Sequence, residues 1–347
     1  MRVLHVLASD RFSGAENVVC QIIGMTRDDP EMEMVYCSKD GQIRDALKEQ
    51  GIVFAPLNAI KMSEMKAVIK KYAPDVIHAH DMRASLIAAL SCGNIPLISH
   101  IHNNAYNSRG LSIKSVAYLF AAVKAKKIFW VSDSSYKGYF FHGLLKNKSS
   151  VLYNVINREE LYAKMEKDRT EYRYDAVYVG RLTYQKNPQR LVKIFSKVVE
   201  LSPSATIAVV GSGDLEAETM HLCEENGLAS NMHFLGFRSN PLKILKDSKL
   251  LVMTSRWEGT PIVALEAMAF GKPIVSTPVD GLRVLIENDK TGYMSEEDNI
   301  LAQKIVEIIT DTEYQKALSC GASKRFNEYN SIDKYRETII ESYKEIV

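Results

Sequence analysis

Cysteine is scarce in this chain and never forms the pairs that mark disulfide frameworks or common metal sites. The five cysteines among 347 residues are scattered, and none lies in a C-x-x-C pair. An odd number of isolated cysteines is typical of a reducing compartment, where thiols stay unpaired. The sequence therefore predicts a cytoplasmic protein without disulfides.

Long apolar runs are also missing. No stretch approaches the roughly 18 residues that a membrane-spanning helix needs. The opening segment 1–8 is too short and too strand-like for a signal peptide. Any membrane association is therefore expected to be peripheral, at the inner face of the plasma membrane.

A strong excess of either charge is absent as well. The chain has 44 Lys and Arg against 42 Asp and Glu, a net charge of +2, which gives no reason to expect a nucleic-acid partner. Basic residues are densest between 109 and 148, where eight accompany the single acid Asp133. Within this region, residues 113–124 are apolar with basic flanks. That pattern is typical either of a buried crossover helix with a charged end or of a surface that rests on anionic lipid headgroups.

Motifs for nucleotide cofactors are incomplete. No G-x4-G-K-[ST] loop occurs, and Gly211-Ser-Gly213 lacks the third glycine of a dinucleotide fingerprint. These absences argue against a nicotinamide enzyme and against a P-loop nucleotidase. We expect no cofactor beyond a co-substrate.

Metal-binding signals are weak. No D-x-D pair occurs, although His78 with His80, and His100 with His102, each share a face of an expected strand. No carboxylate or cysteine at suitable spacing completes a ligand set, so we predict no metal. His78 and His100 fit the core, His80 is equally consistent with the core and with a site, and His102 favours a site.

What the sequence does contain is an alternation of short apolar runs and amphipathic stretches, which predicts parallel sheets covered by helices on both faces. The apolar runs lie near 2–8, 31–37, 52–57, 75–80, 96–102, 126–132 and 149–154, and then near 175–180, 205–211, 231–236, 249–255, 272–278 and 291–295. A densely charged stretch, 158–174, interrupts the series and is interpreted as a linker. We predict an α/β protein with two Rossmann-like doubly wound domains, 1–165 and 166–330, and a cleft between their strand ends where ligands bind.

The segment 255–271 carries the strongest chemical signal. It is expected to run from a strand end through a loop into a helix, with Thr260 as N-cap, Pro261 in the first turn and Gly271 after the end. The start of such a helix attracts an anion. Glu258 before the helix and Glu266 within it would repel a bare phosphate but accept hydrogen bonds from hydroxyl groups. A sugar nucleotide, anionic in the middle and hydroxylated at its ends, satisfies both features.

This segment resembles the C-terminal domain of the retaining GT-B glycosyltransferases of family 4. The resemblance rests on Glu-x7-Glu within S-x-x-E-G-T-P-x-x-x-x-E-A-M-A-x-G-K-P. Other matches follow in the family's order along nearly the whole chain: Ser13-Gly-Ala-Glu16, Asp75-Val-Ile-His-Ala-His80, Asn154-Val-Ile-Asn157, Gly180-Arg-Leu182, Lys186-Asn187, Gly211-Ser-Gly213 and Leu235-Gly-Phe237. The resemblance implies a GT-B fold whose C-terminal helix, 331–347, crosses back and packs on the N-terminal, acceptor-binding domain.

The resemblance also implies catalytic roles. Arg181 and Lys186 match the pair that grips the donor diphosphate, and a cationic fork with a point charge suits a leaving pyrophosphate. Glu258 matches the carboxylate beside the donor sugar. His102 matches the histidine at the end of an N-domain strand that reaches this sugar.

Further residues are implied to bind the substrates. Glu266 matches the carboxylate that holds the ribose hydroxyls, and glycine at Gly14 leaves room for the diphosphate. The residues expected to bind the donor are Gly14, Gly180, Phe237, Arg238, Gly259, Thr260, Pro261, Ile262 and Glu266. His80 and Asn103 are candidates on the acceptor side.

The chain departs from the family pattern at two loops. The family commonly has two glycines where this chain has Ser13-Gly14, and Gly-Gly is frequent where it has Asp280-Gly281. A glutamate often found shortly afterwards is replaced near Val284. These differences bear on the donor more than on the reaction.

The resemblance implies a retaining glycosyltransferase. We expect transfer of a hexosyl or N-acetylhexosaminyl unit from a nucleoside diphosphate sugar, UDP-linked, to a glycan or lipid-linked glycan during synthesis of a capsule, exopolysaccharide or other surface polysaccharide. Two alternatives remain open: a UDP-sugar 2-epimerase of similar two-domain fold, and a non-catalytic carbohydrate-binding relative.

Overall fold

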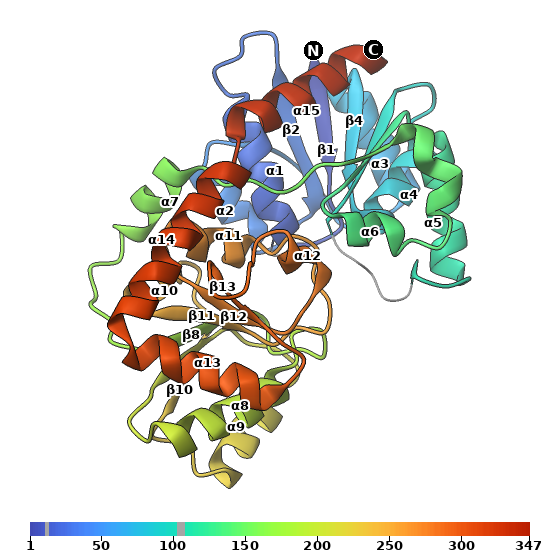
Figure 1. The fold of residues 1–347 in the computed structure, drawn as a ribbon. Coiled ribbons are helices and arrows are strands. Elements are labelled where there is room, and N and C mark those ends of the chain that lie inside the picture. The colour runs from blue at the N-terminus through green and yellow to red at the C-terminus, as the bar shows by residue number, and fades with distance from the viewer. Residues whose placement is uncertain (11–13, 103–107) are drawn as a thin grey trace. The chain divides into compact units, whose positions relative to one another are not determined.

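The computed structural model describes residues 1–10, 14–102 and 108–347, which form two compact units. The first comprises Met1–Asn154 and Ile332–Val347, and the second comprises Val155–Ser331. Each unit has a central sheet with helices on both faces (Figure 1). The predicted α/β class, with two doubly wound parallel sheets, is confirmed.

The sheet of the first unit has seven parallel strands in the order β3-β2-β1-β4-β5-β6-β7. The strands are β1 (Arg2–Val6), β2 (Glu33–Lys39), β3 (Val53–Leu57), β4 (Val76–His80), β5 (Leu97–Ile101), β6 (Lys127–Trp130) and β7 (Ser149–Val151). The chain order reverses between β1 and β4. In a doubly wound sheet, this reversal marks the place outside the carboxyl ends of the strands where ligands bind.

The sheet of the second unit repeats this plan with six parallel strands in the order β10-β9-β8-β11-β12-β13. The strands are β8 (Ala176–Val179), β9 (Ile207–Val210), β10 (Met232–Gly236), β11 (Leu250–Met253), β12 (Ile274–Ser276) and β13 (Gly292–Met294). Here the reversal lies between β8 and β11. The loops that follow these two strands therefore flank the expected ligand site.

Burial on both faces explains why these strands are continuous apolar runs. Along β11, Leu250 and Val252 pack into one core, whereas Leu251 and Met253 pack into the core on the other face. Successive side chains of a strand point to opposite faces, so a sheet covered on both sides needs an apolar residue at every position.

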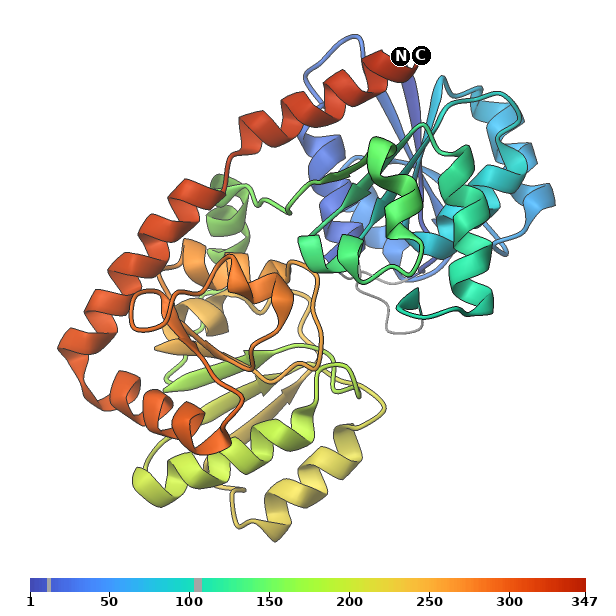
Figure 2. The same ribbon diagram turned by 45° about the vertical axis from the view of Figure 1, so that its right-hand side comes forward.

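The helices of the first unit cover its sheet on both faces. They are α1 (Gly14–Met25), α2 (Ile43–Glu49), α3 (Met62–Tyr72), α4 (Asp81–Ser91), α5 (Ile113–Lys124), α6 (Asp133–Lys137), the 3-10 helix η2 (His142–Lys148) and α15 (Ile332–Ile346). The C-terminal helix α15 belongs to this unit, as expected, and buries Tyr335, Ile339 and Tyr343. The two chain ends consequently lie close together on the first unit (Figure 2).

The helices of the second unit are α7 (Arg158–Met165), α8 (Pro188–Leu201), α9 (Glu216–Glu225), α10 (Leu242–Asp247), α11 (Ile262–Ala269), α12 (Asp280–Arg283), α13 (Asp298–Thr310) and α14 (Thr312–Tyr329). In the described part of the chain, no helix combines the length and the apolar character needed to cross a membrane.

The boundary between the units lies earlier than the sequence placed it. The first unit ends at Asn154, before the charged stretch that was interpreted as a linker. Part of that stretch forms α7, whose Leu161 and Met165 are buried in the core of the second unit. Two apolar side chains one helical turn apart are enough to dock this helix, despite its charged neighbours.

Candidate functional site

Two loops of the second unit are joined at the reversal point of its sheet. The loop after β8 and the loop after β11 exchange hydrogen bonds: the Arg256 amide donates to the Gln185 carbonyl at 2.8 Å, and the Gln185 side-chain amide donates to the Trp257 carbonyl at 3.1 Å. The hydroxyl of Thr254 donates to the carbonyl of Asn187 at 3.0 Å. These bonds hold the two loops in a fixed register at the carboxyl ends of their strands.

An ion pair connects the predicted catalytic residues of these loops. Lys186 Nζ lies 2.6 Å from Glu258 Oε1, and the Ser255 hydroxyl donates to the same oxygen at 2.5 Å. The two charged side chains are only 16% and 7% exposed. The ammonium group has three protons, so pairing with one carboxylate oxygen leaves it able to donate to an anion. The structure thus brings Lys186 and Glu258 into direct contact, which spacing alone had not predicted.

Arg181 stands in the same loop with its side chain exposed. Its backbone carbonyl accepts a hydrogen bond from the Tyr178 hydroxyl at 3.1 Å, which anchors the residue where β8 ends. Among the described residues, its guanidinium donates only one long hydrogen bond, of 3.5 Å, to the Gln185 side-chain oxygen. Because that contact is weak, the guanidinium remains able to bind a carboxylate or a phosphate bidentately.

Helix α11 begins one residue later than predicted. Pro261, with an extended ψ of 124°, takes the N-cap position that was predicted for Thr260. The predicted donor-binding backbone from Gly259 to Ile262 nevertheless leads directly into the first turn, where helix amide groups lack intrahelical acceptors. This backbone packs tightly against α12, because a Cβ added at Gly281 would lie 1.2 Å from the Gly259 carbonyl oxygen.

Glu266 lies inside α11 and is partly buried. Its carboxylate forms no hydrogen bond or ion pair with any residue in the described part of the chain. Burial raises the pKa of Glu266 to about 7, and Lys164 opposes this rise. A desolvated carboxylate without a partner is suited to receive hydroxyl hydrogen bonds from a ligand.

The remaining donor candidates lie apart from this group or in the other unit. Gly180 directly follows β8, whereas Phe237 and Arg238 are exposed after β10, two strands away in the sheet. Gly14 begins α1 of the first unit, and a Cβ added there meets no atom within 4 Å. Asn103 and Ser13 lie outside the described residues.

The first unit contains an array of buried histidines at the reversal point of its own sheet. His5 on β1, His78 and His80 on β4, and His100 on β5 are each at most 1% exposed. His102 follows β5. The sequence paired His78 with His80, and His100 with His102, but it missed His5, which the order of the strands brings beside them.

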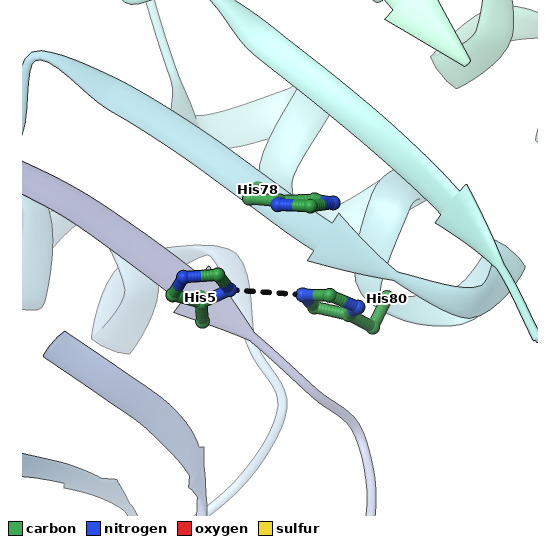
Figure 3. A group of neighbouring side chains, drawn as sticks. All are labelled: His5, His78 and His80. Carbon is green, nitrogen blue, oxygen red and sulfur yellow. Dashed lines mark hydrogen bonds between the residues drawn. The ribbon is translucent and has the colours of Figure 1, made fainter. Parts of the chain in front are cut away.

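Hydrogen bonds link three of these rings in a chain. His5 Nδ1 lies 3.1 Å from His80 Nε2, and His80 Nδ1 lies 2.8 Å from His102 Nε2. Figure 3 shows the first of these contacts. A neutral imidazole has one donor and one acceptor, so the tautomer of His80 dictates the tautomers of its two neighbours.

The array provides nitrogen ligands, but in an unfavourable arrangement for one ion. The nearest ligand atoms of His5, His78 and His80 lie within 4.8 Å of one another. However, the rings of His78 and His80 lie one above the other (Figure 3). Their centroids are 4.3 Å apart and their planes differ by 26°. An ion about 2.0–2.1 Å from a nitrogen of each ring would lie out of the ring planes, away from the lone pairs. The rings of His100 and His102 also lie close, with centroids 4.1 Å apart, but they are tilted by 31°.

Asp81 is a second residue of this region that the sequence did not single out. It begins α4 with a φ of 67°, a left-handed conformation that is rare outside glycine and that clusters at functional sites. Its carboxylate accepts the backbone amide of His102 at 3.0 Å, and burial raises its pKa to about 6. The available signal was its place directly after the strand that ends in His80.

Burial keeps the histidine array neutral. Desolvation lowers the pKa of His5 and of His102 to about 3, and it lowers the pKa of His78, His80 and His100 well below 6.5. The unfolded chain, with ordinary histidine pKa values, therefore binds more protons than the folded chain below about pH 6.5. Acidification through that range must destabilise the first unit.

His100 offers a clean test, since neither of its nitrogens has a hydrogen-bond partner among the described residues. We expect His100→Leu to leave the melting temperature at pH 7.5 nearly unchanged and to make its fall between pH 6.5 and 5 shallower, because one destabilising protonation is removed. Calorimetric scans at several pH values across this range measure how steeply the melting temperature falls with pH. The control is His221→Leu, at an exposed histidine of α9. A slope that stays the same in His100→Leu would contradict a neutral buried array.

Each half of the chain matches a known protein family. Residues 13–160 match the family model described as Glycosyltransferase Family 4, and residues 161–325 match the model described as Glycosyl transferases group 1. Together the two matches extend over most of the chain.

Full-length relatives carry related names. The chain is 23% identical to the Escherichia coli UDP-Gal:alpha-D-GlcNAc-diphosphoundecaprenol alpha-1,3-galactosyltransferase, over 98% of this chain and 97% of the relative. It is 24% identical to the capsular polysaccharide biosynthesis glycosyltransferase CapH of Staphylococcus aureus, over 96% and 95% of the two chains.

Solved structures share the fold. Anabaena HepE in complex with UDP-glucose superposes with a TM-score of 0.88 at 21% identity, covering 99% of this chain and all of HepE. With two family models matching in sequence order and the same two-unit fold, the chain belongs to the family 4 glycosyltransferases of GT-B fold.

Proposed function

We propose that this glycosyltransferase moves a hexosyl or N-acetylhexosaminyl unit from a UDP-sugar to a hydroxyl of a glycan or lipid-linked glycan, with retention of configuration, in the synthesis of a capsule, exopolysaccharide or other surface polysaccharide. The observation that carries the proposal is that Arg181 and the Lys186–Glu258 pair belong to the two loops at the reversal point of the second sheet. We propose that the reaction needs no bound metal.

The diphosphate of the donor is assigned to the cationic side of this site. Arg181 supplies a planar fork and Lys186 a point charge, and the amide groups at the start of α11 add partial positive charge. Two cations and a helix end stabilise the negative charge that grows on a departing diphosphate. Preorganised groups of this kind often contribute the largest part of an enzyme's rate enhancement.

The nucleoside end is assigned to Glu266. Its carboxylate has no hydrogen-bond donor among the described residues, and burial already raises its pKa. Two ribose hydroxyls would provide the missing donors. The preference for a uridine nucleotide draws support from the relatives, since one is named for UDP-galactose and the HepE structure contains UDP-glucose.

A same-face displacement is the mechanism that this site favours. Glu258, the carboxylate paired with Lys186, already accepts hydrogen bonds from both Lys186 and Ser255, which makes it a poor nucleophile. We propose that the bond from the anomeric carbon to the diphosphate breaks while the acceptor hydroxyl bonds to the same face. The hydroxyl proton passes to the departing phosphate oxygen.

The acceptor and pathway rest on the relatives. One is named for an undecaprenol-linked acceptor and another for capsule synthesis. Mass spectrometry of products from a panel of UDP-sugars and glycan acceptors tests the proposal. Transfer that requires an acceptor supports it, whereas an epimerised UDP-sugar formed from donor alone would replace it by the epimerase alternative.

Removing Arg181 should slow the chemical step. We predict that Arg181→Ala lowers kcat by roughly 10²-fold or more, because the charge on the leaving diphosphate loses a preorganised donor. Steady-state release of UDP measures this change. The matched control is Arg173→Ala, an arginine of the same unit whose side chain is 91% exposed, and it should turn over normally. Near-native kcat in Arg181→Ala would refute the assignment.

Donor affinity should depend on the ionisation of Glu266. With a pKa of about 7, its carboxylate is mostly charged at pH 8 and mostly protonated at pH 6. Since only the charged form accepts with both oxygens, we predict that UDP-glucose binds roughly fivefold more weakly at pH 6 than at pH 8. Isothermal titration calorimetry measures the two constants, and the diphosphate of this donor does not titrate in that range.

The Glu266→Gln variant serves as the control. It should bind UDP-glucose more weakly than the wild type at pH 8. Its affinity should be the same at pH 6 and pH 8, because the titrating group is gone. If the wild-type affinity were also independent of pH, or if the variant kept the wild-type pH dependence, Glu266 would not be the residue that holds the ribose.

A further inference from the structure

Helix α5 of the first unit is apolar on two opposite sides. Tyr118, Ala121 and Ala122 face the core and are buried. The opposite side exposes Ile113, Val116, Phe120 and Val123, which follow the helical spacing of three and four residues. Ile113 is 90% exposed and Val123 is 63% exposed. A surface helix normally turns polar side chains outward, so this outer stripe indicates a partner.

The apolar surface extends beyond the helix. Leu111, 72% exposed, directly precedes it. Phe140 and Leu144 are also exposed, in the segment that Tyr139 and Lys148 attach to α5 through hydrogen bonds to the carbonyls of Ser115 and Val123. Helix α5 lies at an outer edge of the first unit in both ribbon views (Figures 1 and 2).

The charges around the stripe are almost all positive. Five exposed lysines of this region form no ion pair with any residue in the described part of the chain: Lys114, Lys124, Lys126, Lys137 and Lys146. The single acid between 109 and 148, Asp133, accepts a hydrogen bond from the Tyr153 hydroxyl. The partner of this surface must therefore be apolar at its centre and anionic around it.

We propose that α5 docks the protein on the surface of a bilayer rich in anionic lipid, with the stripe Ile113–Val116–Phe120–Val123 at the acyl boundary and the lysines on the headgroups. Such a helix lies in the interface and does not span it. A second copy of this chain is disfavoured, because two such faces would bring their lysines together. The proposal deepens the proposed function and rests on it, since a lipid-linked acceptor is presented at this surface.

Flotation of the full chain with vesicles tests the docking. We expect binding to phosphatidylcholine vesicles that contain about a third phosphatidylglycerol, little binding to pure phosphatidylcholine, and release as salt rises to about 0.5 M. Val116→Ser/Phe120→Ser and Lys124→Gln/Lys126→Gln should each weaken binding to the anionic vesicles by about tenfold or more.

Matched controls lie on the second unit. Leu201 of α8 is 57% exposed, and Lys193 of the same helix is also exposed, so Leu201→Ser and Lys193→Gln should bind vesicles like the wild type. Circular dichroism and the thermal shift caused by UDP show that each variant is folded with its donor site intact. If one double variant misfolds, vesicle binding by the other double variant still tests the docking.

Three results would overturn the docking: no preference for anionic vesicles, unchanged binding in both double variants, or a wild-type dimer in the absence of lipid that the Val116→Ser/Phe120→Ser variant abolishes. Transfer to a water-soluble acceptor separates this proposal from the enzymatic one. We expect the α5 variants to keep that activity and to lose activity on vesicle-borne acceptor. A wild-type chain that binds anionic vesicles but transfers nothing would leave the docking supported and the proposed function refuted.

Discussion

The ion pair between Lys186 and Glu258 fixes the geometry on which the donor site depends. Lys186 comes from the loop after β8 and Glu258 from the loop after β11, and their charged atoms meet at 2.6 Å with little access to water. Either charge would be costly to bury alone, because a desolvated ion without a partner loses its hydration. Each residue therefore requires the other. The pair locks together the loops that also position Arg181 and the start of α11.

The two units handle titratable groups at their reversal points in different ways. The second unit keeps charged groups at this point and pairs Lys186 with Glu258. The first unit instead contains four buried imidazoles and that of the partly buried His102, all of which desolvation holds neutral. Neutrality lets the rings stack and share hydrogen bonds, which charged imidazoles would resist. The array ends at His102, whose backbone is anchored by the strained Asp81. The two parallel sheets thus present a charged edge in one unit and a neutral, hydrogen-bonded edge in the other.

Much of the fold could be predicted from sequence, because strands buried on both faces are continuous apolar runs. The features that the sequence did not predict depend mostly on contacts between residues far apart along the chain. His5 is one polar residue in an apolar run, and only the adjacency of β1 and β4 brings it to His80. In the charged stretch, the surrounding charges hid the signal of Leu161 and Met165, so α7 was interpreted as a linker. Thr260 fits a cap, but the extended backbone of Pro261 delays the helix by one residue. The motif around Glu258 identified the family, but it could not show that Glu258 pairs with Lys186, 72 residues away along the chain.

A crystal structure of the full chain with UDP bound is the most direct measurement of the donor site. The diphosphate oxygens should lie within about 3.2 Å of the Arg181 guanidinium, of Lys186 Nζ and of an amide between Gly259 and Ile262, with the ribose hydroxyls on Glu266. A diphosphate bound out of reach of Arg181 and Lys186 would contradict the assignment of these loops as the donor site.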